Sequence, residues 1–281
     1  MKACVLISGE PRVYKHTYFS IKPFIDYINA DVFIHTWNNE TTPRCNNIND
    51  KSKIYNHNQE ELEKDLKEYY NPKLIQIQNK NTLKEYLYRE NIPHIPKDYD
   101  KYINSNYGSV SQWYSAQECN RLKQGYEKEN NFKYDVQIKT RFDTLLTVWE
   151  ESGYKKIIHN IENTTKGITD VFTPWFHIIN GDIMIEYSTL IGNNQSMDKI
   201  WFNIVQDIGF TNTFGHANPH VSITEHIRKN KITLKHWDDL NTILRIIRPS
   251  ENIKFLKEYW YDKNLARVLQ VIHEGNNEWK V

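Results

Sequence analysis

The triplet Arg141-Phe142-Asp143 places two charges directly after residues 134–140, an apolar run typical of a buried strand. A carboxylate at the end of an inner strand is suited to hold a divalent cation that bridges a diphosphate. An arginine in the same turn is suited to bind a phosphate or carboxylate through two parallel N–H donors. A local salt bridge between Arg141 and Asp143 is the structural alternative.

A second polar strand end follows the apolar run at residues 3–8, where the chain continues as Ser8-Gly9-Glu10-Pro11-Arg12. A glycine at such a turn lets the backbone approach a ligand closely. The guanidinium of Arg12 matches the geometry of a phosphate or a carboxylate. The alternative interpretation is an ordinary turn that contains an arginine.

A third strand, at residues 31–37, ends in His35-Thr36-Trp37. If the three strands are parallel neighbours, their carboxyl ends meet at one edge of the sheet, where ligands of open α/β sheets bind. The chain has neither a GxGxxG loop nor a GxxxxGK[ST] loop, which disfavours a dehydrogenase and a P-loop kinase. Together the three ends predict a site for a nucleoside diphosphate.

Strand-like and helix-like patterns alternate along the chain, which predicts an α/β domain with a parallel sheet. Two strand-like runs around Asn180-Gly181 predict an antiparallel excursion with a turn. Residues 38–58 are polar and are expected to form a long loop. The expected strands are 3–8, 31–37, 73–78, 134–140 and the two runs within 169–190; the expected helices are 17–29, 59–70, 82–90, 109–130, 195–209, 221–230 and 250–272.

Composition narrows the class of protein further. The 281 residues are 39% hydrophobic with a net charge of +1 and no basic stripe, so we expect no nucleic-acid partner. No run approaches the roughly 20 apolar residues of a membrane span, so we expect no transmembrane segment. Three widely spaced cysteines favour a reducing compartment, and we expect a cytoplasmic location.

Four stretches, LISGEPR, DVFIHTW, SQWYSAQECNRLKQGYEKENNFKYDVQIKTRFD and NGDIMIEYSTL, resemble glycosyltransferases of GT-A type from large viruses, phages and bacterial polysaccharide loci. The resemblance covers roughly residues 1–190, with a weaker echo at 219–232. It implies one GT-A-like domain with a mostly parallel central sheet flanked by helices. Residues 1–145 would form the nucleotide-binding half, residues 146–249 an acceptor-side half with a smaller antiparallel portion, and residues 250–281 a helical tail.

The resemblance also implies roles on the donor side. Ser8, Gly9 and Arg12 would lie against the nucleotide of a nucleotide-diphosphate sugar, and Thr36 and Trp37 would lie near its base or ribose. The resemblance thus implies a nucleotide-diphosphate sugar as the donor and a glycan or other hydroxyl compound as the acceptor.

The triplet stands where GT-A enzymes carry their DxD motif. Asp143 matches the last, metal-binding carboxylate, and the resemblance implies Mn²⁺ or Mg²⁺ as the cofactor. Arg141 replaces the first aspartate, so it could itself neutralise phosphate charge. A late histidine is a metal ligand in some such enzymes, which makes His220 a candidate ligand.

Ser111, Gln112 and Ser115 lie near the start of the expected helix at 109–130, with Ser109 as its expected N-cap. Helix N-termini favour anions, so these side chains are candidates for contact with the sugar or diphosphate. Helix capping is the structural alternative.

Two acids are candidates for the base that takes the acceptor proton. Asp182 matches the family position that opens a strand facing the acceptor, and its alternative role is that of a turn residue. Glu225 lies on a late helix where similar enzymes present a Pro-Glu pair, although Pro219 is separated from it here. Glu225 could also be an ordinary surface glutamate.

Two other functions remain open. A nucleotidyltransferase acting on sugar phosphates is disfavoured, since such enzymes need a Gly-rich basic loop after the first strand. A catalytically inactive sugar- or nucleotide-binding module is the third hypothesis, because the triplet contains a single carboxylate.

Overall fold

A computed structural model of the chain describes most of the sequence outside its C-terminal part. The described residues are 1–12, 14–41, 54–90, 107–146, 151–173, 176–179, 182–185, 189–209, 219–236 and 244–246.

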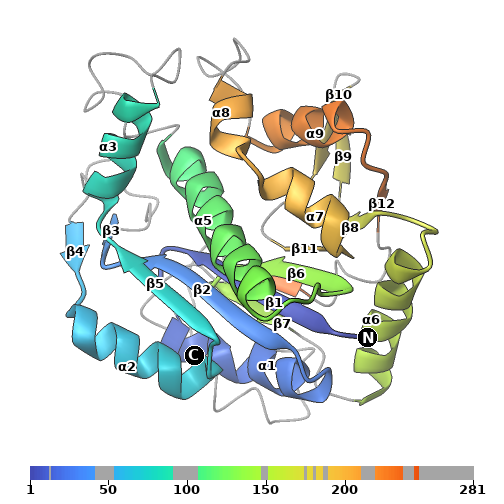
Figure 1. Cartoon of the computed structure of the whole chain (residues 1–281), viewed down its shortest axis with the longest axis horizontal. Coiled ribbons are helices and arrows are strands. Elements are labelled where there is room, and N and C mark those ends of the chain that lie inside the picture. Colours follow the sequence, from blue (N-terminus) through green and yellow to red (C-terminus); the bar gives the residue numbers. More distant parts are fainter. Residues whose placement is uncertain are drawn as a thin grey trace, which may run out of the picture.

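A seven-stranded sheet forms the centre of the molecule (Figure 1). Four adjacent strands are parallel, and β11 is antiparallel to both of its neighbours. The order across the sheet is β12 (Leu234–His236), β8 (Val171–Thr173), β11 (Leu190–Asn193), β6 (Val136–Thr140), β1 (Ala3–Gly9), β2 (Asp31–Trp37) and β5 (Leu74–Gln78). The predicted α/β class with a mostly parallel central sheet is therefore confirmed.

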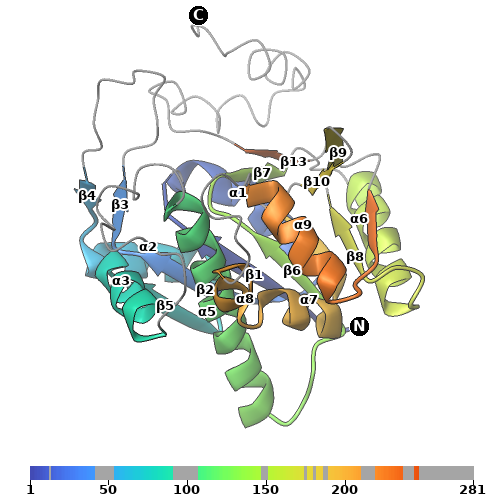
Figure 2. The ribbon, with the colours of Figure 1, turned by 90° about the horizontal axis from the view of Figure 1, so that it is seen from above.

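Helices cover both faces of this sheet (Figures 1 and 2). One face packs against α1 (Tyr14–Tyr27), α2 (Gln59–Tyr70) and α6 (Glu151–Thr165). The other carries α3 (Lys80–Arg89), α5 (Tyr107–Glu129), α7 (Asn194–Trp201), α8 (Ile204–Gly209) and α9 (Pro219–Lys229).

The alternation of side chains along β1 explains why both faces are covered. Val5 and Ile7 belong to the core under α1, whereas Cys4 and Leu6 point to the opposite face and pack near Cys119 of α5. Successive side chains of a strand point to opposite faces, so a strand that is apolar at every position needs a layer on each side. All seven residues of β1 are buried.

Among the described residues, three small antiparallel pairs lie outside the main sheet. The predicted excursion is confirmed as β9 (Phe176–Ile179) paired with β10 (Asp182–Ile185), and β10 packs against α9. The other pairs are β7 (Thr144–Leu146) with β13 (Leu244–Ile246), and β3 (Asn39–Thr41) with β4 (Ile54–Asn56).

Two predictions about local structure were wrong. Residues 38–58 contain the pair β3 and β4, whose three-residue strands are too short for a periodic pattern to show them. The predicted helix at 195–209 is two helices, α7 and α8, because Asn203 adopts a left-handed conformation with φ of 51° between them.

Other boundaries also differ from the predictions. Helix α5 begins at Tyr107, so Ser109 lies inside the helix and is not its N-cap. Helix α6 was not predicted, although its buried residues Tyr154, Ile157 and Ile161 have helical spacing.

The main sheet runs through both predicted halves of the chain, because β8, β11 and β12 follow residue 145. The division at that residue stays a prediction, and the predicted helical tail at 250–281 lies outside the described residues. Cys4 and Cys119 are buried free thiols. Within the described ranges, every helix is too short or too polar to span a membrane.

Candidate functional site

The strand ends predicted to converge do lie side by side. Gly9 at the end of β1 pairs with Thr36 of β2, and Ile7 of β1 pairs with Thr140 of β6. Because β6, β1, β2 and β5 are parallel neighbours, the residues that follow them share one edge of the sheet.

Gly9 forms a tight turn that two side chains hold in place. Its φ of 116° is a conformation that residues with a side chain rarely adopt, so glycine is required for backbone reasons. Its N–H donates to Ser115 Oγ at 2.8 Å, and its carbonyl accepts from Thr36 Oγ1 at 2.8 Å. Ser115 and Thr36 are both fully buried. Their hydrogen bonds fix the backbone of Gly9 in this conformation.

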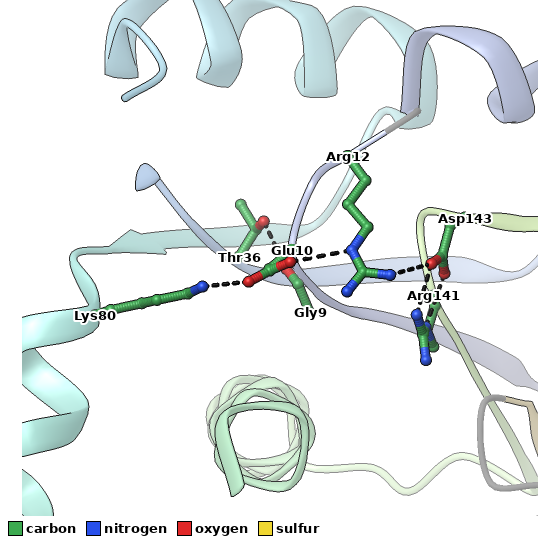
Figure 3. A network of polar contacts seen from close by, with 7 residues as sticks. All are labelled: Gly9, Glu10, Arg12, Thr36, Lys80, Arg141 and Asp143. Atoms are coloured by element: carbon green, nitrogen blue, oxygen red, sulfur yellow. Dashed lines mark hydrogen bonds and ion pairs between the residues drawn. The ribbon is translucent and has the colours of Figure 1, made fainter. Parts of the chain in front are cut away.

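Charged side chains form a continuous network along this edge (Figure 3). Glu10, which follows β1, accepts from Arg12 Nε at 3.0 Å through Oε2 and pairs with Lys80 through Oε1. Lys80 is the first residue of α3 and comes two residues after β5 ends. Burial alone would raise the pKa of Glu10, but Lys80 and Arg12 lower it below its ordinary value, so this carboxylate is ionised at neutral pH.

Asp143 lies between two guanidinium groups (Figure 3). Its Oδ1 accepts from Arg141 Nε at 2.7 Å, and its Oδ2 accepts from Arg141 Nη2 at 2.5 Å and from Arg12 Nη1 at 2.8 Å. Its side chain is 1% exposed, which alone would raise its pKa, but Arg141 and Arg12 hold the pKa below its ordinary value. The carboxylate is therefore a buried anion that the two arginines stabilise.

Among the described contacts of this network, three cationic side chains, Lys80, Arg12 and Arg141, pair with two carboxylates, Glu10 and Asp143. The salt bridge from Arg141 to Asp143, which the sequence left as an alternative, is present. It is extended by Arg12, which lies 131 residues away in sequence. The network links the ends of β5, β1 and β6 into one polar surface.

Glu10 and Lys80 were not among the predicted site residues. For Lys80 a signal exists in the sequence, since it comes two residues after the strand predicted at 73–78. A charged residue at that position belongs to the same carboxyl edge as the other strand ends. Sequence alone did not indicate that Glu10 would join it to Arg12.

The donor atoms around Asp143 do not fit a divalent cation. Both carboxylate oxygens already accept from guanidinium groups, whose charge opposes a metal ion. In the part of the chain that the structure describes, no three His, Cys, Asp or Glu side chains are arranged to hold a metal. This applies to His220 as it does to Asp143, so the predicted Mn²⁺ or Mg²⁺ lacks a ligand set among these residues.

A histidine is buried directly beneath the Gly9 turn. His35 Nδ1 lies 2.8 Å from Ser115 Oγ, and its Nε2 lies 2.9 Å from Gln78 Oε1. Burial lowers the pKa of His35 to about 4, which outweighs the opposing effect of the hydrogen bond to Gln78 Oε1, so the ring is neutral at pH 7. His35 therefore acts as an uncharged link between β2, β5 and α5.

Several predicted donor-binding residues gather on the face covered by α5. Ser8 and Ser111 are buried, Gln112 is half-buried, and Trp37 is fully buried with its ring against Tyr114 at 5.7 Å. Ser8 Oγ, Gln112 Oε1 and Trp37 Nε1 have no hydrogen-bond partner in the described structure. Buried polar atoms are normally paired, so such atoms beside a site are candidates for contact with a ligand.

The acceptor-side candidates lie on two elements that pack together, β10 and α9. Asp182 is the first residue of β10 and pairs with Ile179 of β9. Glu225 is exposed on α9 and bonds Arg228 at 2.8 Å. His220, in the first turn of α9, is half-buried and its carbonyl accepts from Thr224 Oγ1 at 2.6 Å. Their catalytic and metal-binding roles stay predictions.

Comparison with known proteins gives weak structural similarities only. No protein-family model matches the chain, and no curated protein matches it. The TM-scores of the matches given next are below 0.5, so the functional argument rests on the site itself.

Three solved structures illustrate these similarities. A glycosyltransferase involved in the glycosylation of the major capsid of PBCV-1 has a TM-score of 0.44 and 8% identity, over 92% of this chain and 98% of that one. A proposed nucleotide-diphospho-sugar transferase from Desulfovibrio desulfuricans has a TM-score of 0.41 and 11% identity, over 98% of this chain and 96% of that one. A proposed glucose-1-phosphate thymidylyltransferase from Bacillus anthracis has a TM-score of 0.43 and 9% identity, over 93% of this chain and 96% of that one.

Proposed function

We propose that this protein is a glycosyltransferase that moves a sugar from a nucleotide-diphosphate sugar to a hydroxyl group of a glycan or other acceptor. The observation that carries the proposal is the pair of guanidinium groups, Arg12 and Arg141, that Asp143 holds where the parallel strands end. Ligands of open α/β sheets bind at that edge, and guanidinium groups match phosphate geometry. The resemblance of the sequence to GT-A glycosyltransferases supports the same function.

In this proposal the donor diphosphate binds beside Arg12 and Arg141. As the bond between the sugar and the diphosphate breaks, negative charge develops on the departing nucleoside diphosphate. Fixed positive groups aimed at that charge lower the barrier, because they need no reorganisation during the reaction. Ser8 Oγ and Gln112 Oε1, which lack partners in the described structure, supply hydrogen-bonding atoms for the donor.

The acceptor hydroxyl oxygen forms the new bond to the sugar, and its proton goes to a base. Asp182 and Glu225 are the proposed candidates, because each lies on one of two elements in contact. Replacing the base is expected to lower kcat by about 10²- to 10⁴-fold, the usual contribution of a general base. Measuring kcat of Asp182→Asn and Glu225→Gln assigns the role; full activity in both variants would contradict both assignments.

A calorimetric titration of the full chain with UDP-, GDP-, dTDP- and CMP-sugars tests the donor class. We expect one of the diphosphate donors to bind, and turnover to release a nucleoside diphosphate. Arg141→Ala should weaken that binding, whereas Arg89→Ala, a change to an arginine that is 72% exposed, should not. Absence of binding by every donor, or release of pyrophosphate from a nucleoside triphosphate and a sugar phosphate, would contradict the proposal.

A further inference from the structure

We infer that the donor diphosphate is bound by the arginine pair Arg12 and Arg141, which Asp143 aligns, and not by a cation held on Asp143. The inference rests on the proposed function and specifies how its donor is recognised. It starts from the position of the Asp143 carboxylate, which is buried and accepts three hydrogen bonds from the two guanidinium groups.

The geometry gives Asp143 a positioning role. Arg141 uses both Nε and Nη2 on this one carboxylate, which fixes the plane and direction of its guanidinium. Arg12 uses Nη1 on Asp143 and Nε on Glu10, so two carboxylates fix its orientation. Charge-assisted pairs of this kind add geometric specificity as well as energy.

The exposed fractions of the three side chains also indicate that the arginines contact the ligand and that Asp143 positions them. The Asp143 side chain is 1% exposed, whereas Arg141 and Arg12 are 14% and 23% exposed. A ligand arriving from solvent therefore meets the guanidinium groups before the carboxylate. A guanidinium carries five N–H donors in a planar fork, so it can bind a phosphate while it bonds a carboxylate.

The backbone of Arg12 is a further sign of a functional constraint. Its φ of 39° is positive, which is a strained conformation for a residue with a side chain. Such strain persists only where surrounding contacts hold the residue in place, and those contacts here are Glu10 and Asp143. In this conformation the side chain of Arg12 reaches Asp143, which also binds Arg141 (Figure 3).

Calorimetric titration of the full chain with UDP, GDP, CDP and dTDP, first in excess EDTA and then in excess manganese chloride, tests the inference. We expect one of them to bind in EDTA, with a Kd that manganese changes by less than about threefold, or roughly 0.7 kcal/mol. Binding that needs manganese, or that manganese tightens at least about tenfold, would overturn the inference and leave the proposed function standing. If none of the four bound under either condition, the inference and the proposed function would fail together.

Two variants separate the roles of the groups. Arg141→Ala is expected to weaken binding in EDTA by about tenfold or more, since a hydrogen bond to a charged group contributes about 1.5–3 kcal/mol. Asp143→Asn is expected to change the Kd in EDTA by less than about tenfold. The amide oxygen still accepts from a guanidinium, and the loss of the carboxylate makes the net charge of the network more positive by one. Arg89→Ala is the matched control and should bind as the unchanged protein does.

The opposite pattern would assign the ligand contact to Asp143. If folded Asp143→Asn lost binding while Arg141→Ala retained it, the inference would be wrong. Circular dichroism and Tm establish that each variant is folded. If Asp143→Asn does not fold, Arg141→Lys replaces it, and we expect weaker binding in EDTA because an ammonium group cannot form two parallel bonds to a phosphate. Unchanged binding by Arg141→Lys would also overturn the inference.

Discussion

The two ends of helix α5 each lie near a group of charges that includes a buried carboxylate, and the two groups differ in composition. Near the start of the helix, the strand-end network has three cationic groups and two carboxylates. Near its end, Lys123 and Lys133 face Glu127 and Asp198, so charges of both signs are equal.

In the second group, neutral side-chain and backbone groups form hydrogen bonds with the buried charges. Lys123, fully buried, donates to Asn194 Oδ1 at 2.7 Å and Asp198 Oδ1 at 2.5 Å. Glu127 accepts from Asn194 Nδ2 at 2.9 Å and from the backbone N–H of Tyr134 at 3.0 Å. The contacts of this group join α5 to α7 and to the residues that precede β6, so the role of the group is structural.

The comparison teaches how to separate a structural charge cluster from a binding site. Each group contains an almost fully buried and hydrogen-bonded carboxylate, Asp143 in one and Glu127 in the other, so that feature does not distinguish them. The exposure of the cations does, because Asp143 pairs with the partly exposed Arg12 and Arg141, whereas the cation between Glu127 and Asp198 is the fully buried Lys123. Changes to the balanced group should therefore lower stability, and changes to the strand-end network should lower binding.

The largest expected effect is on the balanced group. Lys123→Met should lower the free energy of unfolding by about 3–5 kcal/mol, because it leaves the buried Glu127 carboxylate without its buried cation. Urea unfolding measures this loss. Lys133→Met, which removes a lysine that is 67% exposed, is the control and should cost less than about 1 kcal/mol. Equal losses in the two variants would contradict the structural interpretation.

The next effect is on the strand-end network. Arg12→Ala should weaken donor binding by about 10- to 100-fold, because a charge-assisted hydrogen bond contributes about 1.5–3 kcal/mol. Calorimetry on the folded variant measures this change. Lys123→Met, where enough of it is folded, should bind the donor normally. A folded Arg12→Ala protein with unchanged affinity would remove the distinction between the two groups.

The third expected effect is on the pH dependence of stability, and it acts through His35. The pKa of His35 is lowered to about 4 in the folded protein, whereas an unfolded histidine has a pKa of about 6.5. The unfolded chain therefore binds a proton first, so stability is complete above pH 6.5 and falls as the pH drops toward 4. At pH 5 the expected loss from His35 is about 2 kcal/mol relative to pH 7.

The variant His35→Asn, which keeps a polar group beside Ser115, should lose that part of the pH dependence. Urea unfolding at pH 7 and pH 5 compares it with the unchanged protein and with His159→Asn, a change at an exposed position of α6. His226 is also buried with a lowered pKa, so some dependence should remain in every variant. An unaltered pH dependence in His35→Asn would show that His35 does not cause it.

The smallest expected effect concerns the Gly9 turn. Gly9→Ala should lower the free energy of unfolding by about 1–3 kcal/mol, because of its φ of 116° and not because of crowding, since no atom lies within 4 Å of the added Cβ. Gly125→Ala on α5 is the control and should stabilise the protein by up to about 1 kcal/mol, as alanine favours the helix. A stabilising Gly9→Ala would contradict the positive φ.

Much of the parallel half of the fold was predictable because its signals are local. Helix α2 begins and ends where the sequence predicts, since Asn58 accepts from Glu60 N and Glu61 N at one end and Asn71 adopts a left-handed conformation at the other. The strands β1 and β2 were recognised from short apolar runs. The break between α7 and α8 was not recognised, because the apolar pattern continues through Asn203 and only the backbone turns there.

The candidate site was predictable in its position and not in its contacts. Ser8, Gly9, Arg12, Arg141 and Asp143 were expected at one edge, and the parallel register places the ends of β1, β2 and β6 together. The sequence predicted Asp143 as a metal ligand from its resemblance to DxD. The structure instead surrounds that carboxylate with arginines, one of which comes from a distant turn.

The sequence by itself determined the parallel strands β1, β2, β5 and β6, and the presence of polar residues where these strands end. These properties depend on side-chain periodicity and on turn residues a few positions apart. Tertiary structure decided which charges meet. Glu10 pairs with Lys80 across 70 residues and Arg12 with Asp143 across 131. A charge acquires its role from the partner that folding brings within hydrogen-bond distance, and spacing along the chain carries no record of that distance.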